Sequence, residues 1–356
     1  MKKTLNKTKI ADFATYIGVV IAFIVMNALM NEGLLTRSMK GQLVPICCYI
    51  VMAVSLNLTV GILGELSLGH AGFMSVGAFT GVVTAMSLQS AIPSDGVRLA
   101  LAIVMGAIFA GIAGTLVGIP VLRLRGDYLA IVTLAFGEII KELINCLIIG
   151  HDENGLHIIF NATGAQTVTD LGLTETGKVL IKGAQGATGT DTIASFTAGF
   201  ILIMVTLVVV LNLARSRSGR AIMALRDNRI AAESVGINVT KYKLMAFVTS
   251  AALAGGAGAL YGLNFSNLVS SKFDFNTSIL ILVFVVLGGL GNMWGSIIAA
   301  AVLTVLPEAL RGFADYRMLI SAIVLIVVML ATNSPQMKAL LSKLVPFGKK
   351  GEKEHA

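Results

Sequence analysis

The residues of this sequence that invite a chemical role are ionisable side chains inside apolar runs. Glu138 and Lys141 lie one helical turn apart in a run that begins at about residue 128, and Glu142 follows them. Because a charge at membrane depth costs free energy, such a group is a functional candidate. The alternative is a structural ion pair buried between helices, and the sequence leaves both interpretations open.

A second group surrounds a glycine-rich stretch, Gly64–Gly72, where a membrane helix can be broken or partly re-entrant. Glu65 and His70 flank this stretch, and unwound backbone there would line a solute path. For His70 a satisfied structural role is the alternative. The residues predicted to line the path are Gly64, Glu65, Ser67, Gly69, His70, Glu138 and Lys141.

One stretch resembles part of a nucleotide-binding motif. Gly172–Lys178 fits the opening of a phosphate-binding loop, but Val179 stands where the magnesium-binding Ser or Thr belongs. No strand-to-helix context surrounds it, and it lies on the predicted outer face. We therefore expect no ATPase and no cofactor in this chain.

His151 and His157, with Asp152 and Glu153, suggest a metal site at first sight. Their separation fits no standard ligand motif, and solvated loop histidines are the simpler interpretation. An intramembrane enzyme also lacks support, because no paired carboxylates or nucleophile and base occur at a useful spacing.

Composition identifies the class of protein. Hydrophobic residues make up 56% of the 356 residues, charged residues 13%, and the mean hydropathy is +0.85. Several runs reach the roughly 20 residues that cross a bilayer core. The runs are continuous rather than alternating, which favours helices over a transmembrane β-barrel. The net charge of +8 gathers between the runs, where it sets topology and does not suggest nucleic-acid binding.

The sequence therefore predicts an all-α polytopic membrane protein with about ten transmembrane helices. The predicted spans are 13–31, 42–63, 67–88, 98–121, 128–149, 192–214, 244–264, 276–291, 294–310 and 317–332. The first is long for a signal peptide and lacks a cleavage site, so we interpret it as a retained span. Five spans on each side of the 150–191 loop hint at an internal repeat.

Charge distribution predicts that both termini lie in the cytoplasm. Four basic parts of the chain fall on one side of the transmembrane domain, residues 13–332. They are the lysines of the 1–12 tail, the Arg123/Arg125 loop, the 215–243 segment and the 333–356 tail. The 150–191 loop falls on the outer side. It carries Asp152, Glu153, Asp170, Glu175 and Asp191 against Lys178 and Lys182.

Glycine pairs at four-residue spacing predict close helix contacts. They are Gly77 with Gly81, Gly114 with Gly118, and Gly258 with Gly262. Any one pair can arise by chance among 38 glycines, but together they indicate a tightly packed bundle.

The polar segment 215–243 interrupts the apolar sequence and predicts two short cytoplasmic helices. Ser218 can cap the first and place Ile222 and Leu225 on one face. Asp227 or Asn228 can cap the second, which carries Ala231, Ala232 and Val235 and ends at Gly236. An amphipathic pair on anionic headgroups is the alternative, but acidic Asp227 and Glu233 favour a protein partner.

At this segment the sequence resembles a known family. Ala231-Ala232-x-x-x-Gly236 is similar to the core of the loop by which ABC importer permeases dock onto their ATPases, with Ile230 in place of the leading Glu. From about residue 42 to 332, further motifs resemble branched-chain amino acid ABC importer permeases. These are Gly64–Gly72, Arg123–Leu134, Leu287–Gly295 and Leu306-Pro307-Glu308.

The resemblance implies a type II-like importer permease bundle and a transport subunit rather than an enzyme. It implies a homologous second permease subunit, two cytoplasmic ATPases that bind ATP and Mg, and an external solute-binding protein, at a bacterial inner membrane. The ATPase-coupling residues would be Arg226, Asp227, Asn228, Ala231, Ala232, Glu233 and Gly236.

One departure concerns the substrate. The family's Thr-Gly-Gly-x-x-Gly pattern is replaced by Gly150–Gly155, and the loop that follows is longer than expected. Leucine-type amino acids are the first expectation, with urea or short amides as the alternative. An ion-coupled secondary transporter that uses Glu138 and Lys141 is the alternative from a different class.

Overall fold

A computed structural model gives the fold. It describes residues 2–33, 36–124, 126–152, 155–161, 171–172, 177–309, 323 and 326. Apart from Ile323 and Ile326, the predicted tenth span 317–332 lies outside the described residues, as do the 333–356 tail, Arg125, Glu153, Asp170 and Glu175.

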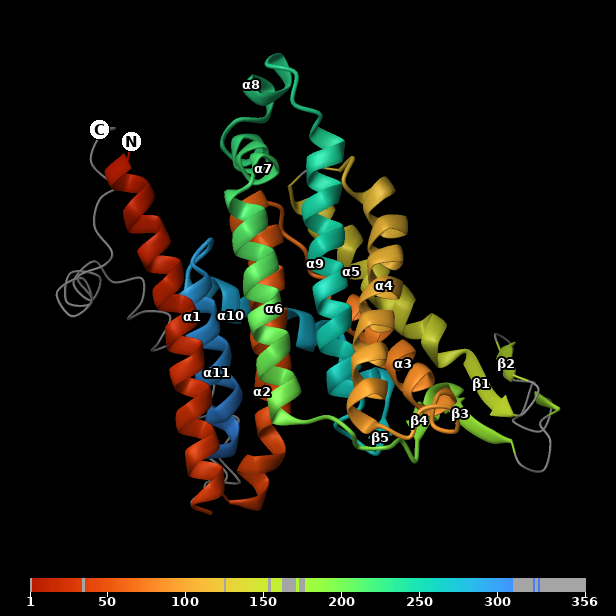
Figure 1. The fold of residues 1–356 in the computed structure, drawn as a ribbon. Helices are drawn as coiled ribbons and strands as arrows, with labels where there is room; N and C mark the ends of the chain where they lie inside the picture. Colours follow the sequence, from red (N-terminus) through yellow and green to blue (C-terminus); the bar gives the residue numbers. More distant parts are fainter. Residues whose placement is uncertain are drawn as a thin grey trace. The chain divides into compact units, whose positions relative to one another are not determined.

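The described residues form mostly helices, with a small sheet (Figure 1). In chain order, the helices are α1 (Lys2–Asn31), α2 (Arg37–Asn57), the π-helix η1 (Leu58–Leu63), α3 (His70–Ser87), α4 (Asp95–Val121), α5 (Asp127–Asn145), η3 (Gly183–Gln185), α6 (Phe196–Arg215), α7 (Arg217–Asp227), α8 (Arg229–Ser234), α9 (Val239–Gly262), η4 (Ser270–Phe273), α10 (Phe275–Gly288) and α11 (Met293–Ala309). The strands are β1 (Leu147–Asp152), β2 (Gly155–Phe160), β3 (Lys178–Lys182), β4 (Ala187–Thr188) and β5 (Asn267–Leu268).

The chain divides into two units. The smaller unit comprises residues 1–35 and 302–356, and the larger, here called the main unit, comprises residues 36–301. Within the smaller unit, α1 supplies an apolar segment, Phe13–Asn31, that is long enough to cross a membrane. All features that position the candidate site belong to the main unit.

The central element of the main unit is the continuous helix formed by α2 and η1. Thr36 caps its start by accepting a hydrogen bond from the Met39 amide, and Gly64 ends it in the left-handed conformation (φ 80°). Within the segment Arg37–Leu63 the most apolar window is 89% buried. This helix is therefore largely buried within the protein.

Helices α3, α4 and α9 pack against one another through glycine. A methyl group at Gly77 of α3 would lie 2.0 Å from the Gly255 carbonyl oxygen of α9, and one at Gly258 would lie 2.0 Å from the Met74 carbonyl oxygen. Gly114 of α4 approaches Ala251 in the same way. The predicted role of the glycine pairs in close helix contacts is confirmed at these positions.

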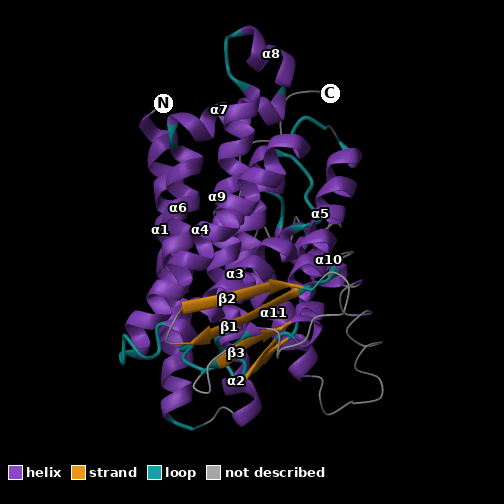
Figure 2. Cartoon of the chain, turned by 90° about the vertical axis from the view of Figure 1, so that its right-hand side faces the viewer, coloured by secondary structure: helices purple, strands orange, loops and turns teal. Residues whose placement is uncertain are grey.

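A five-stranded antiparallel sheet lies at one end of the main unit, opposite α7 and α8 (Figure 2). The strand order is β2-β1-β3-β4-β5, so the sheet joins the segment after α5 to the segment after α9. Register is set by apolar pairs, with Ile149 opposite Ile158 on β2 and opposite Ile181 on β3.

The sheet corrects the expectation of an all-α chain and of an irregular 150–191 loop. Residues 147–149, predicted as the end of the fifth span, belong to β1, and α5 ends at Asn145. Short runs of Ile and Val are compatible with either a helix or a strand, and only pairing with distant segments decides between them.

The other predicted spans coincide with helices where the structure describes them, with one break. Residues 64–69 form no helix, so the first three residues of the predicted third span, 67–69, are not helical and α3 begins at His70. Five helical segments of the described chain are long and apolar enough to cross a membrane: Phe13–Asn31, Arg37–Leu63, Asp95–Val121, Phe196–Arg215 and Val239–Gly262.

The glycine contacts predict a packing-sensitive position. Gly258→Ala places a methyl group against the Met74 backbone, which cannot move aside, and overpacking of this kind typically costs about 1–3 kcal/mol. We expect a lower melting temperature of the purified protein in detergent. Gly96→Ala is the matched control, because a methyl group there meets no atom within 4 Å. Equal melting temperatures for the two variants would contradict the close packing of α3 and α9.

Candidate functional site

The helices α7 and α8 extend from the end of the main unit opposite the sheet (Figure 1). Ser216 accepts a hydrogen bond from the Gly219 amide at 3.0 Å and caps α7, so the expectation that Ser218 is the cap is wrong. Ser216 also follows the last residue of α6. It is therefore the single residue between α6 and α7, and its backbone is extended. Asn228 caps α8 by accepting from the Ala231 amide, as one of the two predicted caps.

The inner face of this helix pair is apolar and buried. Ile222 and Leu225 are 0% and 5% exposed, which confirms their predicted shared face. Ala232 of α8 packs with Leu225 and Val239 in a small cluster. This cluster fixes α8 onto the start of α9 although α8 has only six residues.

The outer face of α8 carries apolar side chains that nothing in the described chain covers. Ile230 is 80% exposed and Val235 is 76% exposed, and Ala231 lies between them in the sequence. Gly236, in the left-handed conformation (φ 83°), turns the chain back toward α9. We call Ile230, Ala231 and Val235 the α8 tip. Two large apolar side chains exposed to this degree make the α8 tip a candidate contact surface.

Arg226 is 42% exposed and pairs with Asp227 at 3.3 Å, and it also reaches the end of the α2–η1 helix. Its Nη1 donates a hydrogen bond to the Gly61 carbonyl oxygen at 2.8 Å. Its aliphatic stem lies over Gly64, where a methyl group would come within 2.5 Å of Arg226 Cγ. Arg226, predicted from the sequence as a coupling residue, therefore contacts the end of the α2–η1 helix.

Glu65 forms an ion pair with Lys243 of α9. The two side chains are 16% and 5% exposed, so the pair is largely removed from solvent. A buried pair holds its partners firmly, since removal of one leaves the other charge uncompensated. Glu65 was predicted at the solute path, whereas its partner Lys243 entered the sequence analysis only as the last residue of the polar segment.

The chain between Gly64 and His70 is held against α5. The Leu68 amide donates to Thr133 Oγ1 at 3.0 Å, and a methyl group at Gly69 would lie 2.0 Å from the Thr133 carbonyl oxygen. His70 is buried, with Nε2 2.8 Å from Ser55 Oγ on α2. Ser67 Oγ is buried without a hydrogen-bond partner among the described residues.

Glu138 and Lys141 form an ion pair on α5, and Lys141 Nζ also lies 3.7 Å from a Glu142 oxygen. Glu138 accepts a further hydrogen bond from the Phe275 amide at the start of α10. The pair thus joins α5 to α10. Gly137, which precedes Glu138 in α5, packs against Gly69. The two groups of predicted path residues, one on α5 and one at the break between Gly64 and His70, therefore lie where α5 crosses this break.

Asn57 is a central residue that the sequence analysis missed. Its Oδ1 accepts from the Gly291 amide at 2.8 Å, and its Nδ2 donates to Ser296 Oγ at 2.9 Å. It therefore connects the α2–η1 helix to the tight turn between α10 and α11, where Gly289 and Gly291 have positive φ. A polar side chain inside an apolar run was the available signal.

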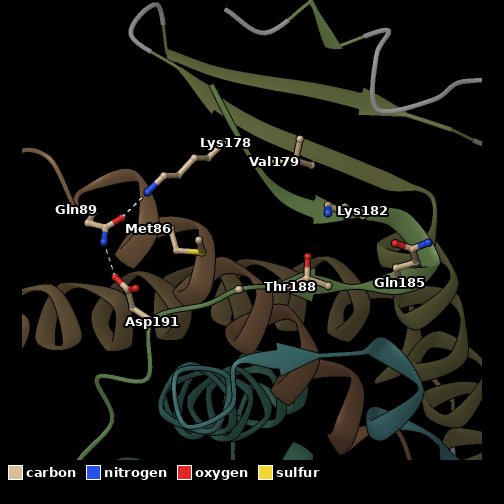
Figure 3. Close-up of a pocket in the computed structure, with 9 residues that line it drawn as sticks. Met86, Gln89, Lys178, Val179, Lys182, Gln185, Thr188 and Asp191 are labelled. Carbon is tan, nitrogen blue, oxygen red and sulfur yellow. Dashed lines mark hydrogen bonds between the residues drawn. The ribbon is translucent and has the colours of Figure 1, made fainter. Parts of the chain in front are cut away.

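At the opposite end, a cavity of about 630 Å³ opens between the sheet and the end of α3 (Figure 3). Lys178 Nζ reaches Gln89 at 3.5 Å, and Gln89 donates to Asp191 at 2.9 Å. Arg98 of α4 also contacts Asp191, at 3.3 Å. Lys182 lines the cavity and makes no side-chain hydrogen bond or ion pair with the described residues.

The histidines of this end make a local contact. His157 Nε2 of β2 lies 3.1 Å from Asp152 Oδ1 of β1. Among the residues that the structure describes, no group of three or more His, Cys, Asp or Glu side chains is arranged to bind a metal ion. Most of the rejected phosphate-loop stretch, residues 173–176, lies outside the described residues.

Comparison with known proteins identifies the family. Residues 38–331 match the family model of the branched-chain amino acid transport system permease component. The chain belongs to this family. The match covers the α2–η1 helix, the helix break, α7 and α8, and the turn after α10, which are the elements described above.

Among similar proteins is the high-affinity branched-chain amino acid transport system permease protein LivM of Escherichia coli K12, which is 35% identical over 292 residues. The alignment covers 79% of this chain and 66% of LivM. LivH of Salmonella typhimurium is 22% identical over 289 residues, with 79% of this chain and 88% of LivH covered. The ribose import permease protein RbsC of Haemophilus influenzae is 32% identical over 123 residues, 32% of this chain and 38% of RbsC. No solved structure matches the chain.

Family membership and the long apolar helices together make this permease a multi-pass inner-membrane protein. Asn57 and the Glu65–Lys243 pair are largely buried, so their contacts lie in a low-dielectric environment. Polar contacts there are stronger than in water, and unpaired polar groups are more costly.

The buried ion pair of this permease gives a prediction about stability. Glu65→Gln leaves Lys243 charged and unpaired in a buried position, and breaking such a pair typically costs about 3–5 kcal/mol. We expect a marked fall in the melting temperature in detergent, and partial recovery when Lys243→Met is added.

The exposed pair Arg229–Glu233 is the matched control, with side chains 32% and 48% exposed. Glu233→Gln should change stability by less than about 1 kcal/mol, as is usual for surface pairs. A Glu65→Gln variant as stable as the Glu233→Gln control would show that the Glu65–Lys243 pair does not hold the helix break.

Proposed function

We propose that this permease is a transmembrane subunit of an ATP-driven ABC importer, and that it translocates leucine-, isoleucine- and valine-type amino acids delivered by an external binding protein. The observation that carries the proposal is the family match across residues 38–331, together with 35% identity to LivM. The chain spans 66% of the length of LivM, so transport activity and the substrate class are proposed for this chain.

The proposed assembly contains a homologous second permease subunit, two cytoplasmic ATPases and the binding protein. LivM and LivH, which are both similar to this chain, are each named as permease proteins of a high-affinity branched-chain amino acid transport system. ATP and Mg would be bound by the ATPases, and this chain would supply about ten spans in a type II-like bundle. Both termini would lie in the cytoplasm.

The proposed ATPase contact is the α8 tip with its flanking residues. Ile230 and Val235 expose apolar side chains to a partner, and the buried cluster of Leu225, Ala232 and Val239 gives α8 a firm base. Asp227, Asn228 and Glu233 would rim this contact. Arg226 lies beside this rim, since its guanidinium pairs with Asp227 as well as donating to Gly61.

The proposed contact of the binding protein is the sheet end of the main unit. The cavity beside β3 presents Lys178 and Lys182, and β2 exposes Leu156, Ile158 and Phe160 on one face. From there the solute path is proposed to pass the Glu138–Lys141 pair and the break at Gly64–His70. Support comes from the position of both groups along the same crossing of α5.

Docking can be tested by adding a charge to the α8 tip. Val235→Asp places a carboxylate on the apolar surface that the ATPase would bury, so we expect loss of ATPase co-purification by at least tenfold while the permease remains inserted. Thr240→Asp is the control, because Thr240 is exposed on the first turn of α9 and lies outside the tip. Unchanged co-purification of Val235→Asp would contradict the proposed contact.

Transport can be tested in proteoliposomes that contain both permeases, both ATPases and the binding protein. We expect uptake of labelled leucine that requires ATP and is competed by isoleucine and valine. Omission of the ATPases should abolish uptake even when a proton or sodium gradient is imposed. Uptake by this chain alone under an ion gradient would identify a secondary transporter, and competition by urea instead of isoleucine would change the substrate class.

A further inference from the structure

The helix α8 is attached to the main unit at two points that bracket it in the sequence. Arg226 precedes α8 and bonds to Gly61, and Lys243 follows α8 and pairs with Glu65. Both attachments therefore end on the same five-residue stretch at the end of the α2–η1 helix. Any displacement of α8 relative to the bundle acts on this stretch from two directions.

The first attachment is a helix cap supplied from outside the helix. The last carbonyl groups of a helix lack partners within it, and the end of the helix carries partial negative charge. Here the Glu65 amide, which α-helical geometry would direct to Gly61, bonds to the Thr59 carbonyl oxygen at 3.1 Å. The guanidinium of Arg226 donates to the Gly61 carbonyl oxygen in its place, as a charge-assisted hydrogen bond.

The capped segment, η1, has the hydrogen bonding of a π-helix and not that of an α-helix. Residues Leu58–Leu63 form a π-helix, a rare conformation that occurs as a local irregularity of α-helices, frequently at functional sites. All six residues are buried, and Gly64 ends the segment at φ 80°. A return to α-helical bonding would move the Gly61 carbonyl oxygen and displace the guanidinium that caps it.

We propose that Arg226 is a positioning residue that transmits movement of α8 to the η1 segment, with the Lys243–Glu65 pair as the second attachment. The inference rests on the proposed function, since the movement of α8 would come from the ATPases. Arg226 acts through its hydrogen bond to Gly61, whereas the α8 tip makes the contact with the partner. Docking and transmission are thus assigned to different side chains.

The movement has a defined onward route. Four residues before Gly61, Asn57 bonds to the Gly291 amide and to Ser296 Oγ. A methyl group at Gly61 would lie 2.3 Å from the Gly291 nitrogen, so the η1 segment and the turn after α10 are in backbone contact. A shift of η1 therefore reaches α10 and α11 without crossing any flexible side chain.

The test compares Arg226→Ala with Arg220→Ala in the full complex of both permeases, both ATPases and the binding protein. Arg220 is on the same helix, is exposed, and donates only to the Arg215 carbonyl oxygen among the described contacts. For Arg226→Ala we expect retained ATPase co-purification and retained ATP hydrolysis, with leucine uptake per ATP reduced at least tenfold. Arg220→Ala should keep the wild-type ratio.

A second measurement follows the break directly. Hydrogen–deuterium exchange over residues 58–68 should change when ADP and vanadate trap the wild-type complex, and this response should disappear in Arg226→Ala. Gly64→Ala should weaken the same response by displacing the Arg226 stem. The double variant Arg226→Ala/Gly64→Ala should lose no more of the exchange response than the single variant with the larger loss, because contacts that act as one unit are not additive.

The outcomes separate the two levels of inference. A nucleotide response or an uptake ratio that survives in Arg226→Ala overturns the transmission role and leaves the proposed function intact. Loss of ATPase co-purification in Arg226→Ala also overturns it, because Arg226 would then be a docking residue. A wild-type complex with neither ATPase binding nor nucleotide response overturns the proposed function and this inference together.

Discussion

A helix that ends inside a membrane bundle must find partners for its last carbonyl groups, and this requirement organises the centre of the structure. The α2–η1 helix ends at Gly64 and is followed by non-helical chain up to Gly69. Arg226 caps the helix, and Thr133 accepts the Leu68 amide, so two distant elements complete the bonding of one break.

The same requirement explains why the cytoplasmic segment and the bundle are joined so tightly. A short helix such as α8 is not stable alone, because the first turn costs more conformational entropy than it recovers in hydrogen bonds. It is held by a buried cluster beneath it and by charged attachments before and after it. The elements that stabilise α8 are therefore the ones through which a force on α8 would reach the bundle, which links stability to the proposed mechanism.

Glycine performs two separate tasks in this permease. In α3, α4 and α9 it removes side-chain bulk, so that backbones such as those of Gly77 and Gly255 come into direct contact. At Gly64 and Gly291 it permits positive φ, and the Gly291 amide donates to Asn57. The first task gives a rigid three-helix core. The second allows the chain to turn at the end of the α2–η1 helix and again between α10 and α11.

The sequence by itself determined the membrane class, the family and the polar segment that carries α7 and α8, because hydropathy and short motifs are local properties. It also predicted that Ile222 and Leu225 share one helix face, since helical period fixes which residues align, and the structure shows that this face is buried. It did not predict the sheet, the Lys243 partner of Glu65 or the hydrogen bond from Arg226 to Gly61. These depend on pairing between segments far apart in the chain, as when β1 meets β3 or α7 meets η1. Only the tertiary structure brings such segments together, and it alone decides which charges are buried and which surface is left for a partner.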